Sequence, residues 1–411
     1  MSLPDGRKVA VVLSGGGANG AYEVGVLKAL MSGKSPVNGY RPLVPDIVTG
    51  TSIGALNAAL LVSQWDEYGP AAINNLERFW LDRLAGGVRS NGMFRVRGNP
   101  LELLDPASYF PNPLRTFQRL VADGGYLTWE GLQRAVAFAT TDPCGSPERR
   151  LLDQLDISVF ISMEPFERTL REIDYRAIQR STLWLKIATT NWATGELRVF
   201  WNHDMTEGFG PFALKASASV PGIFPPVAYG AQTFVDGSIL MNTPLSLGIH
   251  AGAEILHVIY LDPEVANIPL ARGAQAYSSI FRIFQIAWAT AYNDDIGDAA
   301  RINRSLRALE QLRARLPLDA EADDLLQEVA QVKAPPGRAP FRPLTVHRYH
   351  PRDPLPGDVS FLNFDRDRIE ELIERGFQDA IYHDCEESQD VFPDADEEVP
   401  SGKLDSRHGI S

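Results

Sequence analysis

Short apolar runs that end in glycine-rich turns, each followed by a helical pattern, dominate the N-terminal region. Residues 8–13 are rich in β-branched side chains and predict a buried strand, and residues 46–49 predict a second one. A glycine turn follows each strand, and helical patterns follow the turns at residues 21–30 and 55–63. Strand, turn and helix repeated in this order predict an α/β fold, with a mainly parallel central sheet flanked by helices.

This rhythm is lost between about residues 84 and 153. Glycines and prolines interrupt that stretch throughout, and apolar pairs such as Met93-Phe94 and Tyr109-Phe110 lie between them. Such a composition predicts an irregular, cap-like insertion rather than a part of the sheet. The apolar pairs suggest the hypothesis that the insertion opens at a lipid surface.

Strands and helices resume after the insertion. Four strands are predicted there, at residues 183–189, 196–201, 232–235 and 254–261. Apolar positions at helical spacing then predict a helical segment over about residues 275–333, with one amphipathic helix near Ile280 and a second near Ile302. A closing strand and helix are predicted within residues 341–382.

The length of the chain fits one large domain with an insertion. We expect this single domain to span residues 1–383. The remaining residues, 384–411, are dominated by acidic side chains as far as Glu398 and are polar afterwards. Because such a segment has little apolar surface to bury, we expect an acidic, disordered tail.

The composition is ordinary for a globular protein, but the charge is strongly acidic. Hydrophobic residues make up 44% of the chain and charged residues 22%. The formal net charge is −13, from 52 acidic and 39 basic residues. A negative surface repels phosphate backbones, so nucleic-acid binding is disfavoured, as is recruitment to anionic membranes by overall charge.

The two cysteines, Cys144 and Cys385, are too few for a disulfide framework or a metal site, and they indicate a reducing compartment. The N-terminus lacks the apolar run of a signal peptide, and no stretch approaches the roughly 18 uncharged apolar residues of a membrane-spanning helix. We therefore expect a cytoplasmic protein, with peripheral contact to membranes left open. We expect no metal and no cofactor, and the sequence does not indicate the oligomeric state.

A serine in the second glycine turn is the first candidate for catalysis. The run Gly50-Thr51-Ser52-Ile53-Gly54 places Ser52 between a strand and a helix, as in the nucleophile elbow of hydrolases. The two glycines would prevent clashes with the adjacent strand and helix, and the helix N-terminus would favour the negative charge of acyl transfer. The alternative is a glycine-rich packing turn.

The first glycine turn is a candidate anion-binding loop. Successive backbone N–H groups of Gly15, Gly16 and Gly17 can converge on an anion, because no Cβ stands in the way. The anion would be the oxyanion of acyl transfer or a phosphate, and together with Gly20 the loop also fits a dinucleotide fingerprint. That fingerprint requires an acidic residue at the end of the second strand, where this chain has Thr49. A tight turn without a ligand is the remaining interpretation.

Asp236 is a candidate base, although it lies far from Ser52 along the chain. It ends a short predicted strand and precedes Gly237. A carboxylate at the carboxyl edge of a parallel sheet is well placed to meet a ligand or another loop. By itself, an Asp-Gly pair is more often only a turn.

Three segments resemble patatin-like phospholipases of the bacterial type, in order and in spacing. Residues 14–27 (SGGGANGAYEVGVL) are similar to the family's oxyanion loop and first helix. Residues 50–57 (GTSIGALN) are similar to its elbow, and residues 216–227 with 235–237 are similar to its final catalytic block. The similarity covers roughly residues 8–262 without the insertion, and it implies the three-layer fold of that family.

The resemblance implies a serine lipid acyl hydrolase with a Ser–Asp dyad and no histidine. Carried over by motif position, Ser52 attacks the ester carbonyl, and Asp236 accepts its proton and later helps to activate water. The amides of Gly15, Gly16 and Gly17 would hold the oxyanion. The implied enzyme is a carboxylic ester hydrolase of the phospholipase A or lysophospholipase type. Its substrates would be phospholipids or lysophospholipids at a transient membrane or micelle surface.

The sequence departs from the family pattern at two positions. Position 19 is asparagine where the family usually has arginine or lysine, so cationic help to the oxyanion is absent or is replaced by an amide. Ser238 stands where a second glycine is usual after Asp236-Gly237, which is tolerated if its φ is negative.

Three further interpretations stay open. An α/β-hydrolase esterase with a Ser-Asp-His triad would recruit His250 or His257, although the strand around His257 favours a packed core residue and His250 is expected at the surface. A non-catalytic module would bind a nucleotide or a lipid through the glycine loop. An inactive scaffold is the third possibility, suggested by Asn19.

Overall fold

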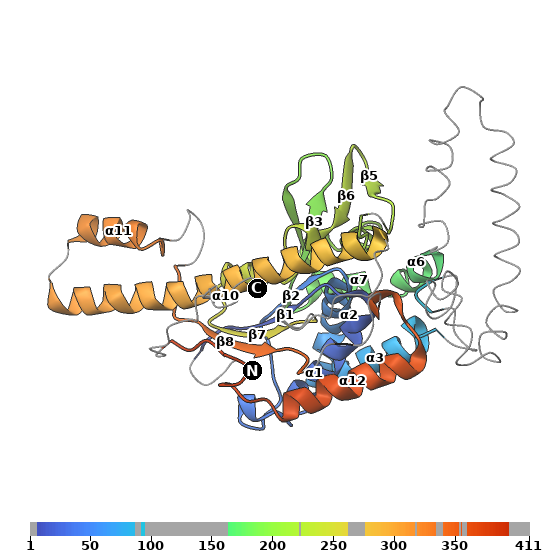
Figure 1. Cartoon of the computed structure of the whole chain (residues 1–411), viewed down its shortest axis with the longest axis horizontal. Helices are drawn as coiled ribbons and strands as arrows, with labels where there is room; N and C mark the ends of the chain where they lie inside the picture. The colour runs from blue at the N-terminus through green and yellow to red at the C-terminus, as the bar shows by residue number, and fades with distance from the viewer. Residues whose placement is uncertain are drawn as a thin grey trace, which may run out of the picture.

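The computed structural model describes residues 6–86, 92–94, 163–221, 223–261, 276–316, 319–333, 340–352, 355 and 360–393, and it describes the side chains of the longest helix from residue 296 onward. These residues form three layers, in which one β-sheet lies between two groups of helices (Figure 1). The predicted α/β architecture is confirmed. Most of the predicted insertion, namely residues 87–91 and 95–153, lies outside the described residues.

The sheet contains eight strands within the described part of the chain, in the order β5-β6-β3-β2-β1-β7-β8, with β4 paired to β3. Their bounds are β1 Val9–Leu13, β2 Ile47–Thr51, β3 Trp184–Asn191, β4 Leu197–Trp201, β5 Val227–Tyr229, β6 Gln232–Asp236, β7 Ile255–Ile259 and β8 Thr345–Tyr349. Strands β3, β2, β1, β7 and β8 run parallel. Strands β4 and β6 are antiparallel to β3, and β5 is antiparallel to β6.

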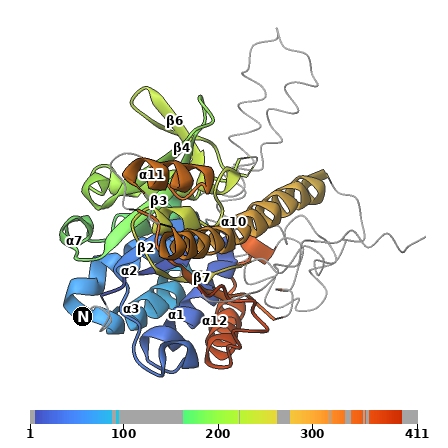
Figure 2. The same cartoon turned by 90° about the vertical axis from the view of Figure 1, so that its left-hand side faces the viewer.

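Helices cover both faces of this sheet, as the turned view confirms (Figure 2). The α-helices are α1 Gly20–Met31, α2 Ile53–Tyr68, α3 Ala72–Phe79, α6 Glu164–Leu170, α7 Tyr175–Arg180, α8 Gly210–Ser217, α9 Leu245–Ile249, α10 Ala276–Arg315, α11 Ala320–Val329 and α12 Arg366–Ile381. Shorter helical turns include η1 Gly17–Asn19, η4 Trp80–Leu84, η9 Gly237–Ile239 and η11 Ser360–Leu362. Helices α1, α2, α3 and α12 lie on one face, and α10 crosses the other (Figure 1).

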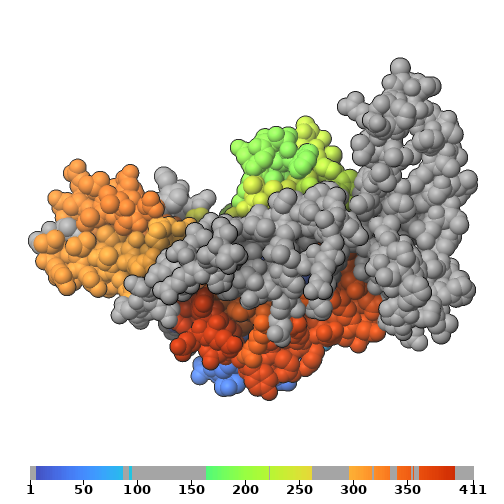
Figure 3. Space-filling model, in the orientation of Figure 1, coloured from blue at the N-terminus to red at the C-terminus, as the bar shows by residue number. Residues whose placement is uncertain are grey.

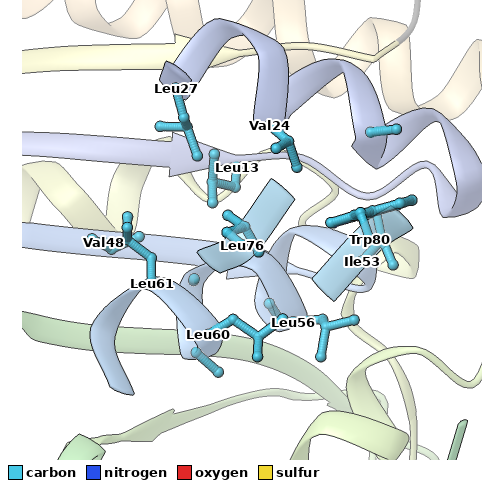
Figure 4. Packing of buried hydrophobic residues seen from close by; sticks show 14 of the residues in the cluster. Leu13, Val24, Leu27, Val48, Ile53, Leu56, Leu60, Leu61, Leu76 and Trp80 are labelled. Carbon is cyan, nitrogen blue, oxygen red and sulfur yellow. The ribbon is translucent and has the colours of Figure 1, made fainter. Parts of the chain in front are cut away.

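The central strand β1 explains why both faces are covered. Its alternate residues point to opposite sides of the sheet, and all five are buried. Val11 and Leu13 join the core under α1 and α2, where Leu27 and Leu61 also pack (Figure 4). Ala10 and Val12 join a second core, together with residues of α10 such as Ile302. A strand that is apolar on both sides is stable only in the middle of three layers.

Helix α10 differs from the sequence prediction of two successive helices. It is one helix of 40 residues, Ala276–Arg315, and its end stands out from the body of the molecule together with α11 (Figure 3). The stretch between the two apolar patterns holds no proline, and its one glycine, Gly297, is tolerated inside a helix. Within the described residues no helix, α10 included, combines the length and apolar character that crossing a membrane requires.

The predicted disordered tail also needs correction over its first ten residues. Residues 384–393 are described and lie against the edge strand β8. Val391 forms an antiparallel bridge with Val346, and Asp390 is only 4% exposed. The acidic composition misled the prediction because the histidines that partner Asp390 lie in preceding elements. Residues 394–411 lie outside the described part of the chain.

Candidate active site

Ser52 stands at a sharp turn between β2 and α2, as the elbow pattern predicts. Its φ of 56° and ψ of −124° lie in a region that side chains other than glycine rarely adopt. The turn is possible because Gly50 and Gly54 flank it. A Cβ on Gly50 would collide with the carbonyl oxygen of Gly54, and a Cβ on Gly54 would come within 2.6 Å of the carbonyl oxygen of Leu13. The backbone therefore holds Ser52 at the start of α2, where the helix dipole favours negative charge.

Strand register brings Asp236 to this elbow. Thr51 lies opposite Ala188 in the β2–β3 ladder, and Thr189 lies opposite Asp236 in the β3–β6 ladder. Ala188 and Thr189, which are adjacent in β3, thus pair with the residue before Ser52 and with Asp236. β6 is antiparallel to β3 and pairs only with its last three residues, Thr189–Asn191. Its final residue, Asp236, therefore lies beside the carboxyl ends of the parallel strands, at the edge of the sheet where the sequence placed it.

The carboxyl group of Asp236 is fully buried and has few hydrogen-bond partners. Its Oδ1 accepts a hydrogen bond of 2.8 Å from the backbone N–H of Ser238, which has a negative φ. Burial raises the pKa of Asp236 to about 6, although hydrogen bonds from Ser238 and Ser52 pull it down. Within the described residues Oδ2 has no hydrogen bond of full geometry, so the contact with the Ser52 hydroxyl is a loose one. Contacts of this kind often tighten when substrate binds.

The glycine loop lies against the same serine. A Cβ added to Gly15 would come within 3.2 Å of the Ser52 Cβ. However, the N–H of Gly15 donates to the carbonyl oxygen of Asn242 at 3.0 Å, so the prediction that this amide serves the oxyanion is wrong. In the described part of the chain no acceptor is recorded for the amides of Gly16 and Gly17, and Gly17 has a φ of 56°. Of the three predicted amides, those of Gly16 and Gly17 are therefore the remaining candidates for an anion.

A buried polar network that the sequence analysis did not identify supports this loop. Glu23 in α1 accepts a hydrogen bond of 2.7 Å from the backbone N–H of Ser14, directly before the glycines. Asn57 in α2 donates to the other carboxyl oxygen of Glu23 at 2.8 Å, and Trp80 donates to Asn57 at 2.7 Å. Burial raises the pKa of Glu23 well above its usual range. The polar residues Glu23 and Asn57 on otherwise apolar helices were the signal that could have revealed the network.

Arg368 of α12 approaches the position where the family usually carries a cation. Its Nη2 donates to Oδ1 of Asn19 at 3.2 Å, and Asn19 is itself buried. The guanidinium Nε has no hydrogen-bond partner within the described residues. The positive charge that the sequence lacks at position 19 is thus present nearby, on a helix that closes the fold more than three hundred residues later.

The histidines of the triad hypothesis lie in other surroundings. His257 is buried in β7, as expected, and its Nδ1 is 3.0 Å from the hydroxyl of Tyr349. His250 follows α9 and packs near Phe341. The hydrogen bonds recorded for the Asp236 carboxyl group in the described residues come from serines, and none comes from a histidine.

The apolar pairs of the predicted insertion divide into a described and an undescribed part. Tyr109 and Phe110 lie outside the described residues. Phe94 is 2% exposed and packs against Phe224 and Phe364, with ring centroids 5.9 Å and 5.4 Å away. Phe94 therefore packs in the core in this structure, and the opening of the insertion at a lipid surface stays a hypothesis.

The described residues that could hold a metal ion lie at the other end of the sheet. His347, His383, Cys385 and Asp390 each offer one ligand atom there, and these atoms all lie within 4.8 Å of one another. None of them contacts the elbow.

Comparison with known proteins places the elbow and the aspartate in a family context. A family model described as patatin-like phospholipase matches residues 11–249, more than half of the 411-residue chain. The matched range includes the glycine loop, Ser52 and Asp236. A lysophospholipase nte1 from Aspergillus terreus is 42% identical over 85 residues, which are 19% of this chain and 5% of that protein. The chain thus corresponds to a small part of that relative.

A likeness to one solved structure is weaker. The crystal structure of VipD from Legionella pneumophila has 14% sequence identity and a TM-score of 0.31. The alignment covers 91% of this chain and 69% of that chain. A score this low carries no argument about function.

Proposed function

The chain belongs to the patatin-like phospholipase family, and on that premise we propose that it is a lipid acyl hydrolase with Ser52 as nucleophile and Asp236 as general base. One observation carries this proposal above all. A serine held in a strained elbow faces a fully buried carboxyl group whose pKa burial raises to about 6. A base with this pKa is ionised at neutral pH and still basic enough to take a proton in the transition state.

The proposed reaction has two stages. In the first, the Ser52 hydroxyl attacks the acyl carbonyl carbon while Asp236 accepts its proton, and the proton then passes to the departing alcohol oxygen. In the second, a water molecule loses a proton to Asp236 and attacks the acyl carbon. The bond from this carbon to the Ser52 oxygen then breaks and releases the fatty acid, and the proton passes from Asp236 to the Ser52 oxygen. The amides of Gly16 and Gly17 stabilise the negative charge on the carbonyl oxygen in both stages. Each such donor is typically worth about 2.7–4 kcal/mol in the transition state.

The proposed substrates are phospholipids or lysophospholipids. The family description names phospholipases, and the Aspergillus relative is named a lysophospholipase. Both descriptions support ester bonds of fatty acids as the class of bond that is cleaved. A lipid panel would identify the head group and the position of the scissile ester.

We further propose that the enzyme meets its substrate at a membrane or micelle surface through a projecting pair of hairpins. The β3–β4 and β5–β6 hairpins stand out from the body of the molecule (Figure 1). Trp192 and Tyr229 near their tips are 53% and 50% exposed, and the two tips are joined by a hydrogen bond from Trp192 N–H to the carbonyl of Thr233. Exposed tryptophan and tyrosine side chains favour the membrane–water boundary.

Labelling with a fluorophosphonate probe tests the proposed nucleophile. We expect the wild type and the control Ser63→Ala, a serine farther along α2, to be labelled, and Ser52→Ala to remain unlabelled. Hydrolysis of a lipid panel should fall by at least about a thousandfold in Ser52→Ala and Asp236→Asn, and should be unchanged in the exposed control Asp298→Asn. Labelling or hydrolysis that survives in Ser52→Ala would disprove the proposal.

The same assay separates the dyad from the triad. The proposed dyad predicts that His250→Gln and His257→Gln keep kcat within about threefold of wild type, because no proton passes through an imidazole. A loss of several orders of magnitude in either folded variant, as observed for triad members, would favour the triad instead.

A further inference from the structure

A cluster of metal-ligand residues lies at the outer edge of the sheet, far from the elbow. His347 belongs to the edge strand β8, His383 follows α12, and Cys385 and Asp390 belong to the segment that folds back onto β8. The ligand atoms of all four residues lie within 4.8 Å of one another. Three separate parts of the chain thus bring together two imidazoles, one thiol and one carboxylate.

The cluster is largely excluded from solvent. The side chain of Asp390 is 0% exposed, and those of His347 and His383 are 11% and 3% exposed. Asp390 Oδ2 lies 2.8 Å from Nδ1 of His347 and 3.0 Å from Nε2 of His383. Both imidazole nitrogens therefore point at the same carboxylate oxygen.

Neighbouring groups hold these side chains in the orientation that ligands need. The other oxygen of Asp390 accepts a hydrogen bond of 2.8 Å from the backbone N–H of Arg348, which leaves Oδ2 for the centre of the cluster. The Ser388 hydroxyl lies 3.5 Å from Nδ1 of His383, the nitrogen that faces away from the cluster. His257 stacks on His347 with ring centroids 5.1 Å apart. Such outer contacts are characteristic of metal sites, where they fix the ligand's tautomer and direction.

We infer that His347, His383, Cys385 and Asp390 form a structural zinc site. Zinc prefers four ligands drawn from cysteine, histidine and carboxylate, in a tetrahedron. Zinc–ligand bonds of 2.0–2.3 Å imply ligand atoms about 3.3–3.8 Å apart. The two nitrogen–oxygen distances of 2.8 Å and 3.0 Å would therefore lengthen by a few tenths of an ångström, and the farthest pair of ligand atoms, within 4.8 Å, would close by about 1 Å at most. Calcium and magnesium prefer oxygen ligands alone, and this donor set excludes them. Four protein ligands leave no open position, which is typical of a structural site.

The charges of the cluster fit a divalent cation. Zinc binds cysteine as the thiolate, so its binding would displace the proton of the Cys385 thiol to the solvent. The thiolate and the carboxylate then balance the two positive charges of the ion.

A cavity beside the cluster offers a route for the ion. It has a volume of about 90 Å³, and His383, Tyr349, Glu387 and Ser388 are among the residues that line it. Because His383 belongs to both the cavity and the cluster, an ion in the cavity is one side chain away from the ligands. The carboxylate of Glu387 gives this route a negative group.

The site would fasten the C-terminal segment to the edge of the sheet. β8 is the last strand of the sheet, and such an edge is prone to pair with other chains unless it is covered. Val391 covers it with a single bridge to Val346. Zinc would join this covering segment to β8 and to the end of α12.

Metal analysis of the full-length protein, produced with zinc and without a polyhistidine tag, tests the inference. We expect close to one zinc ion per chain, and its loss in Cys385→Ser and His383→Gln. The matched controls Cys144→Ser and His203→Gln should retain zinc, since Cys144 is the other cysteine and His203 has a side chain that is 76% exposed. After zinc is removed with a chelator, added Co²⁺ should produce a cobalt–thiolate charge-transfer band in the wild type and in both controls.

A second measurement uses only the wild type, so it does not depend on whether the variants fold. We expect zinc to protect Cys385 from alkylation, as read by peptide mass spectrometry, and a chelator to abolish the protection. Cys144 serves as the internal reference. Equal alkylation of Cys385 with and without zinc, or the absence of both bound zinc and the cobalt band, would show a hydrogen-bonded cluster only and would overturn the inference. None of these readouts depends on lipid hydrolysis.

Discussion

Two buried aspartates at opposite ends of the sheet have opposite pKa shifts. Burial raises the pKa of Asp236 to about 6, because hydrogen bonds from Ser238 and Ser52 offset only part of the desolvation. Burial also acts to raise the pKa of Asp390, but hydrogen bonds from two imidazoles outweigh it and hold this pKa well below the usual range. The kind of partner decides the direction of the shift: the hydroxyl and amide groups at Asp236 are neutral, whereas imidazoles add electrostatic attraction to their hydrogen bonds at Asp390.

This difference separates a reactive carboxylate from a structural one. Asp236 has one oxygen without a proper hydrogen bond, so its charged form is costly and it can take up a proton readily. Both oxygens of Asp390 are engaged, by the Arg348 amide and by the imidazoles, so its charged form is stable. Predictions that change one aspartate or its surroundings can test this comparison.

Replacement of Asp390 should have the largest effect on stability. Asp390→Asn removes the charge that two buried imidazoles face, and we expect it to lower the free energy of unfolding by about 3–5 kcal/mol, as when one partner of a buried pair is removed. Chemical denaturation with a chelator present measures this effect independently of zinc. The exposed control Asp298→Asn should change stability by less than about 0.5 kcal/mol. A loss no larger than the control's would mean that the partners of Asp390 contribute little.

The substitution Asp236→Asn should instead raise the free energy of unfolding. The folded pKa of about 6 lies above the ordinary value of 3.8, so the folded protein loses stability as pH rises from about 4 to above 6. This shift corresponds to about 3 kcal/mol, and Asp236→Asn removes the cost while adding amide protons that need an acceptor. We expect a net gain of about 1–3 kcal/mol at pH 8 and no gain at pH 4. Denaturation curves of wild type and variant at the two pH values measure it, and equal gains at both would contradict the assigned shift.

The elbow was predictable because its chemistry is local. The spacing of Gly50, Ser52 and Gly54 after an apolar strand determines the turn, and the structure contains this turn between β2 and α2. The partnership with Asp236 could be expected only from the resemblance to a family. No local pattern shows that β6 runs antiparallel to β3, and this direction decides where its last residue lies. The amide of Gly15 was misassigned for the same reason, since its acceptor, Asn242, is distant in sequence.

The sequence analysis missed the cluster of His347, His383, Cys385 and Asp390. The acidic composition of the C-terminal segment was given more weight than the spacing of its histidine and cysteine. His383 and Cys385 are separated by one residue, which is a usable signal for a shared ligand, but the acidic residues after them favoured a disordered tail. His347 and Asp390 are 43 positions apart and meet only when the chain returns to β8. A charge-rich segment can fold when another element of the structure supplies buried hydrogen-bond partners for its charged groups. The average composition of the segment does not indicate whether such partners exist.

The pH dependence of catalysis should reveal the titration of Asp236. Because only the ionised carboxylate accepts the Ser52 proton, kcat/KM should fall about tenfold for each pH unit below an apparent pKa near 6. A soluble short-chain ester avoids effects of pH on lipid surfaces. Activity that stays constant between pH 8 and pH 4.5 would exclude a base with this pKa and would weaken the contrast with Asp390.

The smallest predicted effect concerns Arg368, which brings to the glycine loop the positive charge that position 19 lacks. Its Nη2 donates to Asn19, so removal of the charge should weaken the loop's hold on a developing oxyanion. We expect Arg368→Gln to lower kcat by about tenfold, or about 1.4 kcal/mol, with little change in KM. Arg368→Lys should recover part of the loss, and Arg366→Gln, on the same helix but with a side chain that is 45% exposed, should have none. An increase in KM with unchanged kcat would assign Arg368 to substrate binding rather than to the oxyanion, and the asparagine at position 19 would then have no cationic substitute.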